Sequence, residues 1–239
     1  MFGVLSSTRE NVMSTVLEPP PPSVTSPSEA QLTLRTLEDL VNELGGIPLS
    51  RVRVSPPIGE ASESDLLTPQ GRLCELVNGA ILEKGMGFFE SRMATLLAHY
   101  IENWLANHKE GFVVADGALT RLQDGLVRIP DVSFYRWDRI GEKNVPRDPI
   151  CRTVPNLAVE IVSRTNTRAE MDRKRQEYFE AGVELVWIVY PDTMTVEVWS
   201  TARDCHISGR EDTLTGGTVL PGFQLSINDW FQRANGGPA

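Results

Sequence analysis

Residues 157–162 form a nearly continuous apolar run that contains one carboxylate, Glu160. Such a run is typical of a β-strand covered on both faces, and we predict a buried strand over residues 155–163. A charged carboxylate in that position costs on the order of several kcal/mol unless a cation or strong hydrogen-bond donors meet it. We therefore expect a partner for Glu160 elsewhere in the chain.

A helix is predicted directly after this strand. Thr167 and Glu170 have the spacing of a capping box, and Gly182 stands where a helix-ending glycine is common. On a helical wheel, Lys174 falls on the apolar side that faces the sheet, where it can reach a buried carboxylate or a phosphate. The ordinary alternative is a lysine that extends its amine into water.

The rest of the chain alternates between strand and helix patterns, which favours an α/β fold (α+β mixed) with a mixed β-sheet and helices packed against it. Helices are predicted at 36–44, 88–108 and 225–231. Strands are predicted at 73–84, with a hairpin turn at Asn78-Gly79, at 112–122 and 126–135, and at 186–190 and 195–199 as a hairpin, with a further short strand pair within 212–223. A loop rich in charge and proline is expected over 138–153.

Composition divides the chain into four parts. Residues 1–30 are rich in proline and serine and are predicted to be a disordered extension. Residues 31–70 are predicted to form an N-terminal helical arm on the main domain. That domain is expected over 71–232, followed by a flexible tail over 233–239.

Charge and cysteine content limit the class of protein. The formal net charge of -9 argues against a protein that coats nucleic acid electrostatically, although it leaves room for a local basic groove. Cys74, Cys151 and Cys205 are scattered, so neither a disulfide framework nor a zinc site is indicated. Without a secretory signal or a long apolar segment, we expect a protein of the reducing cytoplasm that has no membrane partner.

Two further carboxylates lie in apolar surroundings. Asp131 follows Pro130, which cannot donate to a strand ladder. Together with Glu160 it would suit magnesium, a hard cation that takes one or two carboxylates along with waters and phosphate oxygens. Alternatively, Asp131 is a strand-end carboxylate bonded to backbone amides. Glu75 is either a third carboxylate of the same site or an exposed strand residue.

Arginine and lysine are concentrated over residues 164–175, although the protein as a whole is acidic. Such a cluster can bind a phosphate backbone. More commonly it is a solvated helix face whose cations pair with nearby acids.

The order of these motifs resembles the PD-(D/E)XK nuclease superfamily and, within it, the Uma-two family of restriction-endonuclease-like proteins. The resemblance covers about residues 71–231 and rests on the following segments: 74–79 (CELVNG), 128–134 (RIPDVSF), 157–163 (LAVEIVS), 171–183 (MDRKRQEYFEAGV) and 187–191 (WIVYP). It implies a restriction-endonuclease-like core with a central mixed β-sheet flanked by helices.

The resemblance also implies a site and a reaction. It implies a magnesium ion, with manganese as a substitute, held by Asp131, Glu160 and the backbone carbonyl of Ile161. The superfamily lysine would fall at Val162, whereas this branch carries it on the following helix, where Lys174 matches. Lys174 would then orient the attacking water and stabilise charge in the transition state.

Two other family positions bear on the site. Glu75 matches the acidic residue of the early hairpin. Glu90 stands where the family often has a histidine, so no role is assigned to Glu90.

The function expected from these residues is magnesium-dependent endonuclease cleavage of DNA, by a homodimer. The alternative is a catalytically silent interaction or DNA-binding module with the same fold, which the acidic net charge favours. A third, weaker expectation is hydrolysis of a different phosphodiester. The intact set of Asp131, Glu160 and Lys174 favours the enzyme.

Overall fold

The computed structural model describes residues 1, 3, 36–71, 73–85, 87–115, 117–141 and 144–236. Apart from Met1 and Gly3, the predicted extension over 1–30 therefore lies outside the described residues, and so do residues 237–239 of the predicted tail. The unit that begins at Thr36 contains all the helices and strands described below.

A six-stranded sheet forms the centre of this unit. Its strands lie in the order β11 (Cys205–Ser208), β10 (Thr195–Trp199), β9 (Leu185–Tyr190), β8 (Leu157–Ile161), β6 (Val132–Arg136) and β3 (Gly111–Ala115). β8 and β9 run parallel, and the other neighbours are antiparallel. The sheet is therefore mixed, as predicted.

A second sheet carries the early hairpin. Its strands lie in the order β2 (Ala80–Glu83), β1 (Cys74–Val77), β5 (Leu126–Arg128), β4 (Leu119–Gln123) and β7 (Ile150–Cys151). The predicted turn at Asn78-Gly79 connects β1 to β2, and both of its residues have positive φ. A separate pair, β12 (Thr213–Gly216) and β13 (Leu220–Ser226), confirms the strand pair expected near 212–223.

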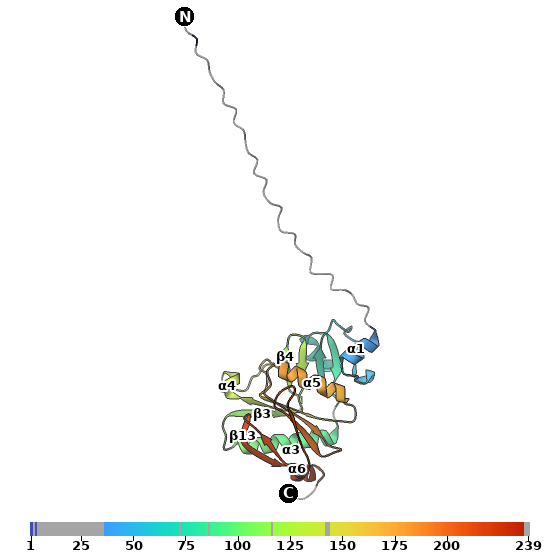
Figure 1. Cartoon of the computed structure of the whole chain (residues 1–239). Coiled ribbons are helices and arrows are strands. Elements are labelled where there is room, and N and C mark those ends of the chain that lie inside the picture. Colours follow the sequence, from blue (N-terminus) through green and yellow to red (C-terminus); the bar gives the residue numbers. More distant parts are fainter. Residues whose placement is uncertain are drawn as a thin grey trace. The chain divides into compact units, whose positions relative to one another are not determined.

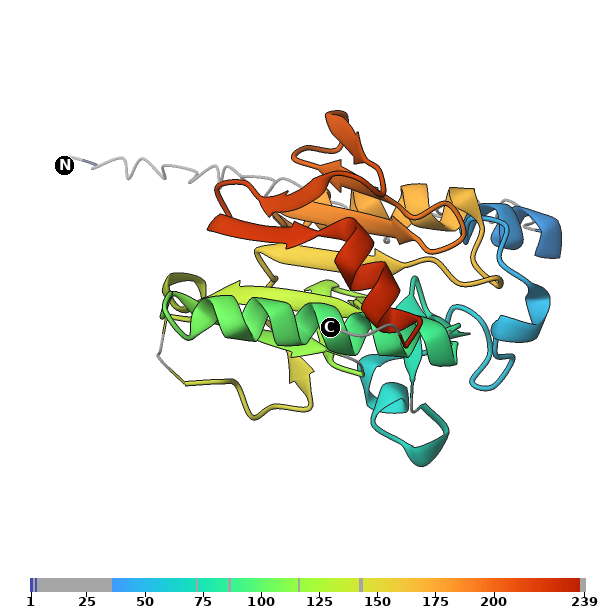
Figure 2. The same cartoon turned by 90° about the horizontal axis from the view of Figure 1, so that it is seen from below.

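Helices cover both faces of the central sheet (Figures 1 and 2). α3 (Phe88–Leu105) and α6 (Ile227–Ala234) pack on one face, and α5 (Arg168–Glu180) packs on the other. α6 thus extends into the segment that was predicted to be a flexible tail. None of the helices within the described residues has both the length and the apolar character needed to cross a bilayer.

The two faces of β8 divide its side chains between these layers. Leu157, Val159 and Ile161 belong to the apolar cluster beneath α3 and α6, whereas Ala158 belongs to the cluster beneath α5. Because side chains alternate along a strand, Glu160 points to the same side as Ala158. The position of Glu160 in the strand therefore directs its carboxylate towards α5.

The prediction of two long strands, over 112–122 and 126–135, was wrong. Residues 112–122 divide into β3 and β4, and residues 126–135 divide into β5 and β6, with the members of each pair in different sheets. Gly117, with φ of +89°, allows the first break. Pro130 accompanies the second because it has no N–H to donate to a continuous ladder. As a result, β4 and β5 pair in the second sheet, and β3 and β6 pair in the central one.

The N-terminal part of the unit packs against the start of α5. It contains α1 (Leu37–Glu43), α2 (Glu63–Leu66) and two short 3₁₀ turns, η1 (Leu49–Arg51) and η2 (Pro69–Gly71). The Arg51 guanidinium donates to both carboxylate oxygens of Glu170, at 2.9 and 2.8 Å, and both side chains are buried. This explains why the predicted capping box is only half formed. The Thr167 hydroxyl accepts the Glu170 N–H, but the carboxylate of Glu170 binds Arg51 and Asn166.

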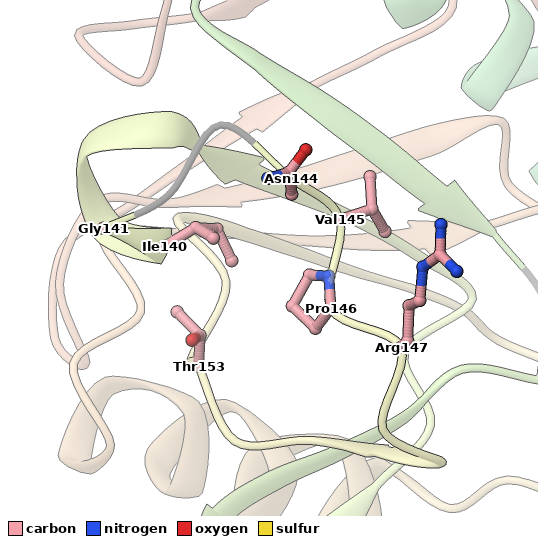
Figure 3. Close-up of a pocket in the computed structure, with 7 residues that line it drawn as sticks. All are labelled: Ile140, Gly141, Asn144, Val145, Pro146, Arg147 and Thr153. Atoms are coloured by element: carbon pink, nitrogen blue, oxygen red, sulfur yellow. The ribbon is translucent and has the colours of Figure 1, made fainter.

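The region expected to be a loop over 138–153 contains the end of α4 (Trp137–Ile140) and all of β7. A hollow of about 990 Å³ lies against it. Figure 3 shows the residues that line this hollow: Ile140, Gly141, Asn144, Val145, Pro146, Arg147 and Thr153. None of these described residues is among the predicted site residues.

The packing of α3 on the sheet yields a prediction for stability. Leu97 on α3 is 0% exposed, whereas Leu37 on α1 is 55% exposed. We expect Leu97→Ala to lower the free energy of unfolding by about 2–5 kcal/mol, because it removes buried methyl groups and leaves a cavity. Leu37→Ala is the matched control and should change it by less than about 0.5 kcal/mol. Urea denaturation measures both, and equal losses would contradict the assignment of α3 to the core.

Candidate active site

Glu160 meets two residues of α5. Its Oε2 accepts a hydrogen bond from Lys174 Nζ at 3.1 Å, and its Oε1 accepts one from the hydroxyl of Tyr178. Lys174 and Tyr178 lie one helical turn apart, so both reach the same carboxylate from one helix face. Lys174 is 2% exposed, which excludes the alternative of a lysine extended into water. The partner expected for Glu160 is present.

Lys174 also binds the second predicted carboxylate. Its Nζ lies 3.1 Å from Glu75 Oε1, and Glu75 on β1 is fully buried. Glu75 accepts a further hydrogen bond from the Ile129 N–H at 3.1 Å. Glu75 is therefore a buried member of the same cluster as Glu160 and is not an exposed strand residue.

Arg128 joins Glu75 to α5. Its Nη1 donates to Glu75 Oε2 at 2.8 Å, and its Nη2 lies 2.6 Å from Glu177 Oε2. Arg128 is almost completely buried. The sequence analysis assigned no role to Arg128, although a cation inside the apolar segment before Pro130 is the same kind of signal that singled out Glu160.

Asp131 lies at the junction of β5 and β6. Its Oδ2 accepts the Ile161 N–H at 2.6 Å, and its own N–H donates to the Val159 carbonyl at 2.9 Å. Asp131 Oδ1 lies 2.7 Å from Lys84 Nζ, which also donates to the Ile129 carbonyl. Asp131 therefore combines the backbone bond of the plain alternative with an ion pair. Sequence reasoning missed Lys84, whose only signal was its place just after the second strand of the hairpin.

The structure thus brings all the predicted site residues to one region, at the end of β8 and beneath α5. Lys174 contacts both Glu75 and Glu160, while Asp131 contacts the backbone of Ile161 and a different lysine. The described residues include no group of three or more His, Cys, Asp or Glu side chains arranged to hold a metal ion. Acids and bases instead alternate through the cluster.

Burial and charge act in opposite directions on these groups. Burial by itself raises the pKa of the Glu75 carboxyl, but Lys174, Arg128 and Lys84 outweigh it and hold that pKa well below its usual range. At Glu160, burial prevails over the nearby lysines and the pKa is raised. Burial would lower the pKa of Lys174, yet the carboxylates of Glu160 and Glu75 keep it above its usual value. Lys174 is therefore a cation at neutral pH.

A cleft of about 1000 Å³ opens beside this cluster. It is lined by residues that follow β2, β8 and β9, among them Lys84, Val162 and Pro191. Its described lining includes three cationic residues and three acidic residues: Arg51, Lys84 and Arg164, and Glu83, Glu90 and Asp192. The two signs are equal in number, so the described lining of the cleft is not a basic groove.

The cations of 164–175 mostly serve as ion-pair partners. Arg168 lies 2.5 Å from Glu197, and Arg173 lies 2.7 Å from Glu177. The Arg175 guanidinium lies 3.8 Å from the centroid of the Trp199 ring. The paired, structural interpretation of this cluster therefore holds, and only Arg164 of the cluster's arginines lines the cleft among the described residues.

The lowered pKa of Glu75 predicts how the stability of the fold depends on pH. A carboxyl group with a lowered folded-state pKa stabilises the fold above its unfolded pKa, and the contribution is lost as the pH falls towards the folded value. At pH 7 we expect Glu75→Gln to lower the free energy of unfolding by about 3–5 kcal/mol, because Arg128 and Lys174 lose a buried partner. The difference in unfolding free energy between the variant and wild type should become smaller as the pH falls below about 4. Urea denaturation at pH 7, 4 and 3 tests this, and a difference that does not change with pH would contradict it.

Comparison with known proteins bears on the whole domain. The model of the Uma2 family, described as "Putative restriction endonuclease", matches residues 61–228. Among solved structures, the chain is similar to the crystal structure of a putative nuclease belonging to DUF820 from Anabaena variabilis ATCC 29413. That match has a TM-score of 0.60 and 20% sequence identity, and it covers 67% of this chain and 90% of the other. A search of curated proteins finds no match.

The structural match and the family match support different conclusions. At 20% identity, the solved structure shows the fold alone, which is the restriction-endonuclease-like fold that the sequence predicted. The family match begins inside the predicted arm over 31–70 and covers well over half of the 239 residues. The chain therefore belongs to the Uma2 family of restriction-endonuclease-like proteins.

Proposed function

We propose that this protein is a magnesium-dependent DNA endonuclease. The family and the fold support a nuclease. The observation that carries the proposal is the 2.6 Å hydrogen bond from the Ile161 N–H to Asp131 Oδ2. This bond holds one carboxylate at the end of β8, where Glu160 and the Ile161 carbonyl are also located.

The donors present fit magnesium in kind. Asp131, Glu160 and the Ile161 carbonyl would supply hard oxygen ligands, and magnesium needs only one or two carboxylates when water completes its shell. Each carboxylate already accepts a bond from a lysine, but a carboxylate has about four lone-pair positions and can bind a cation as well. At Asp131 the ion would also repel the nearby Lys84 ammonium, so we expect the contact between Lys84 and Asp131 to weaken when magnesium binds.

A bound magnesium ion would lower the pKa of a water molecule and offset negative charge on the phosphate. The contribution of the chain is to hold the ligands in place. Lys174 and Tyr178 fix the two oxygens of Glu160, and the Ile161 N–H fixes Asp131. Glu75 and Arg128 hold Lys174 and α5 behind this arrangement. Here Lys174 is a positioning residue as well as a source of positive charge for the site.

A second candidate function is a nuclease-fold module that binds without cutting. Two observations favour it: the formal net charge of -9 and the equal numbers of acids and bases in the charged lining of the cleft. Such a module would bind DNA or protein with an affinity that does not depend on magnesium.

The homodimer and the cytoplasmic location remain predictions. Light scattering after size-exclusion chromatography would test the homodimer.

Removal of the Glu160 charge tests the proposed activity. We expect Glu160→Gln to reduce magnesium-dependent nicking of supercoiled plasmid DNA by at least about 100-fold, because the site loses a ligand while the shape of the side chain is kept. Circular dichroism should show that the variant still folds, because Lys174 retains Glu75 as a partner.

Glu180→Gln provides a control with the same chemical change at an exposed position of α5. It should nick DNA at the wild-type rate. Equal rates for wild type and Glu160→Gln would refute the assignment of the site, and so would wild-type nicking that persists in EDTA.

A further inference from the structure

The two lysines of the cluster differ in what lies next to them. Lys174 faces Glu75 and Glu160, and it is absent from the described lining of the cleft. Lys84 lines the cleft at the end of β2, and its side chain turns inward to Asp131. Its ammonium group contacts one carboxylate and one backbone carbonyl, whereas that of Lys174 contacts two carboxylates. The side chains of both lysines are only 3% exposed, but of the two only Lys84 is among the described residues that line the cleft.

The backbone around Lys84 is fixed by close packing. The Lys84 N–H donates to the Leu73 carbonyl at 2.9 Å. A Cβ atom on Gly85 would lie 2.3 Å from Thr165 Oγ1, and one on Gly87 would lie 2.0 Å from Glu90 Oε2. Gly85 therefore packs closely against the loop that follows β8, and Gly87 packs closely against the first turn of α3. With its backbone held there, Lys84 can redirect its charge only through its four-carbon side chain.

The cleft holds few cations that are free to meet a phosphate. Its described cationic lining residues are Arg51, Lys84 and Arg164. Arg51 is buried and bound to Glu170 through two hydrogen bonds. Of the other two, only Lys84 contacts a proposed metal ligand. A phosphate bound next to that ligand would therefore lie close to Lys84.

A metal ion at Asp131 and the Lys84 ammonium group have like charges, which repel strongly at short range in a buried site. A metal ion bound to Asp131 would therefore displace the Lys84 ammonium from its present place. The cleft is the space that Lys84 already borders, and a substrate phosphate there would attract the ammonium.

We propose that Lys84 is a further catalytic residue, which leaves Asp131 when the metal binds and then contacts the substrate phosphate undergoing cleavage. This proposal rests on the proposed function. It divides the work between two lysines: Lys174 positions Glu160, and Lys84 stabilises the charge that develops on the phosphate.

Three variants test the role of Lys84. Lys84→Met keeps the length of the side chain and removes the charge, Lys84→Arg keeps the charge, and Lys109→Met makes the same change at an exposed position away from the cleft. We expect Lys84→Met to nick supercoiled plasmid at least about 100-fold more slowly. Lys84→Arg should retain at least a tenth of the wild-type rate, and Lys109→Met should match wild type. Thermal unfolding checks that all three variants fold.

Metal and DNA binding separate this role from a merely structural one. Calorimetric titration with Mn²⁺ should give Lys84→Met an affinity equal to or higher than that of wild type, because its ammonium no longer competes for Asp131. In Ca²⁺, which serves here as a metal for binding without cleavage, its affinity for a labelled DNA duplex should fall about three- to tenfold. A Lys84→Met variant that loses Mn²⁺ affinity in proportion to its rate would overturn the proposal.

The nicking assay also distinguishes failure of this inference from failure of the proposed function. If Glu160→Gln is inactive while Lys84→Met cuts within twofold of wild type, only the role of Lys84 is refuted. A Lys84→Arg variant as slow as Lys84→Met would likewise refute a role for the charge. If wild type and Glu160→Gln are equally inactive with Mg²⁺ and with Mn²⁺, the proposed function fails and the catalytic role of Lys84 fails with it.

Discussion

The buried ion pair between Glu160 on β8 and Lys174 on α5 is the interaction on which the arrangement of the site depends. It joins the central strand of the mixed sheet to the helix that covers it, at 3.1 Å and almost out of contact with water. Through Glu75, the same lysine also ties in β1 of the second sheet. One cation thus joins two consecutive elements, β8 and α5, to a strand about a hundred residues earlier in the chain.

Stability alone is a weak reason for such a cluster. Desolvation of buried charges offsets much of their attraction, and replacement of a buried ion pair by apolar residues of similar volume is often neutral or stabilising. Here, acids and bases from β1, β5, β8 and α5 meet in a closed network with well-formed hydrogen bonds. A set of carboxylates held in defined positions near a cleft is what a metal-dependent hydrolase requires. The proposed function is therefore a better physical explanation than stability for keeping these charges buried.

Much of this arrangement could be predicted from the sequence. Glu160 stood out because it interrupts an apolar strand pattern, and Lys174 because it lies on the sheet-facing side of the next helix and matches the lysine of the family that the sequence resembles. The hairpin at Asn78-Gly79 and the order of motifs along the chain were also informative. Together they predicted the fold and the family, and both are confirmed.

The rest depended on contacts between distant segments. Arg128 gains Glu177 only when the second sheet packs against α5, and Lys84 gains Asp131 only when the end of β2 lies beside the junction of β5 and β6. Local patterns could not show that a single apolar stretch would divide between two sheets near Pro130. The capping box at Thr167 was half right for the same reason, because Arg51, more than a hundred residues away, binds the carboxylate of Glu170.

The most direct test of the central claim is a crystal structure of the protein with manganese, with the ion located by its anomalous scattering. Our account predicts an anomalous peak between Asp131 and Glu160, within coordination distance of the Ile161 carbonyl, with the Lys84 side chain turned away from Asp131 into the cleft. A structure at saturating manganese with no peak at that position, and with Lys84 still bound to Asp131, would contradict it.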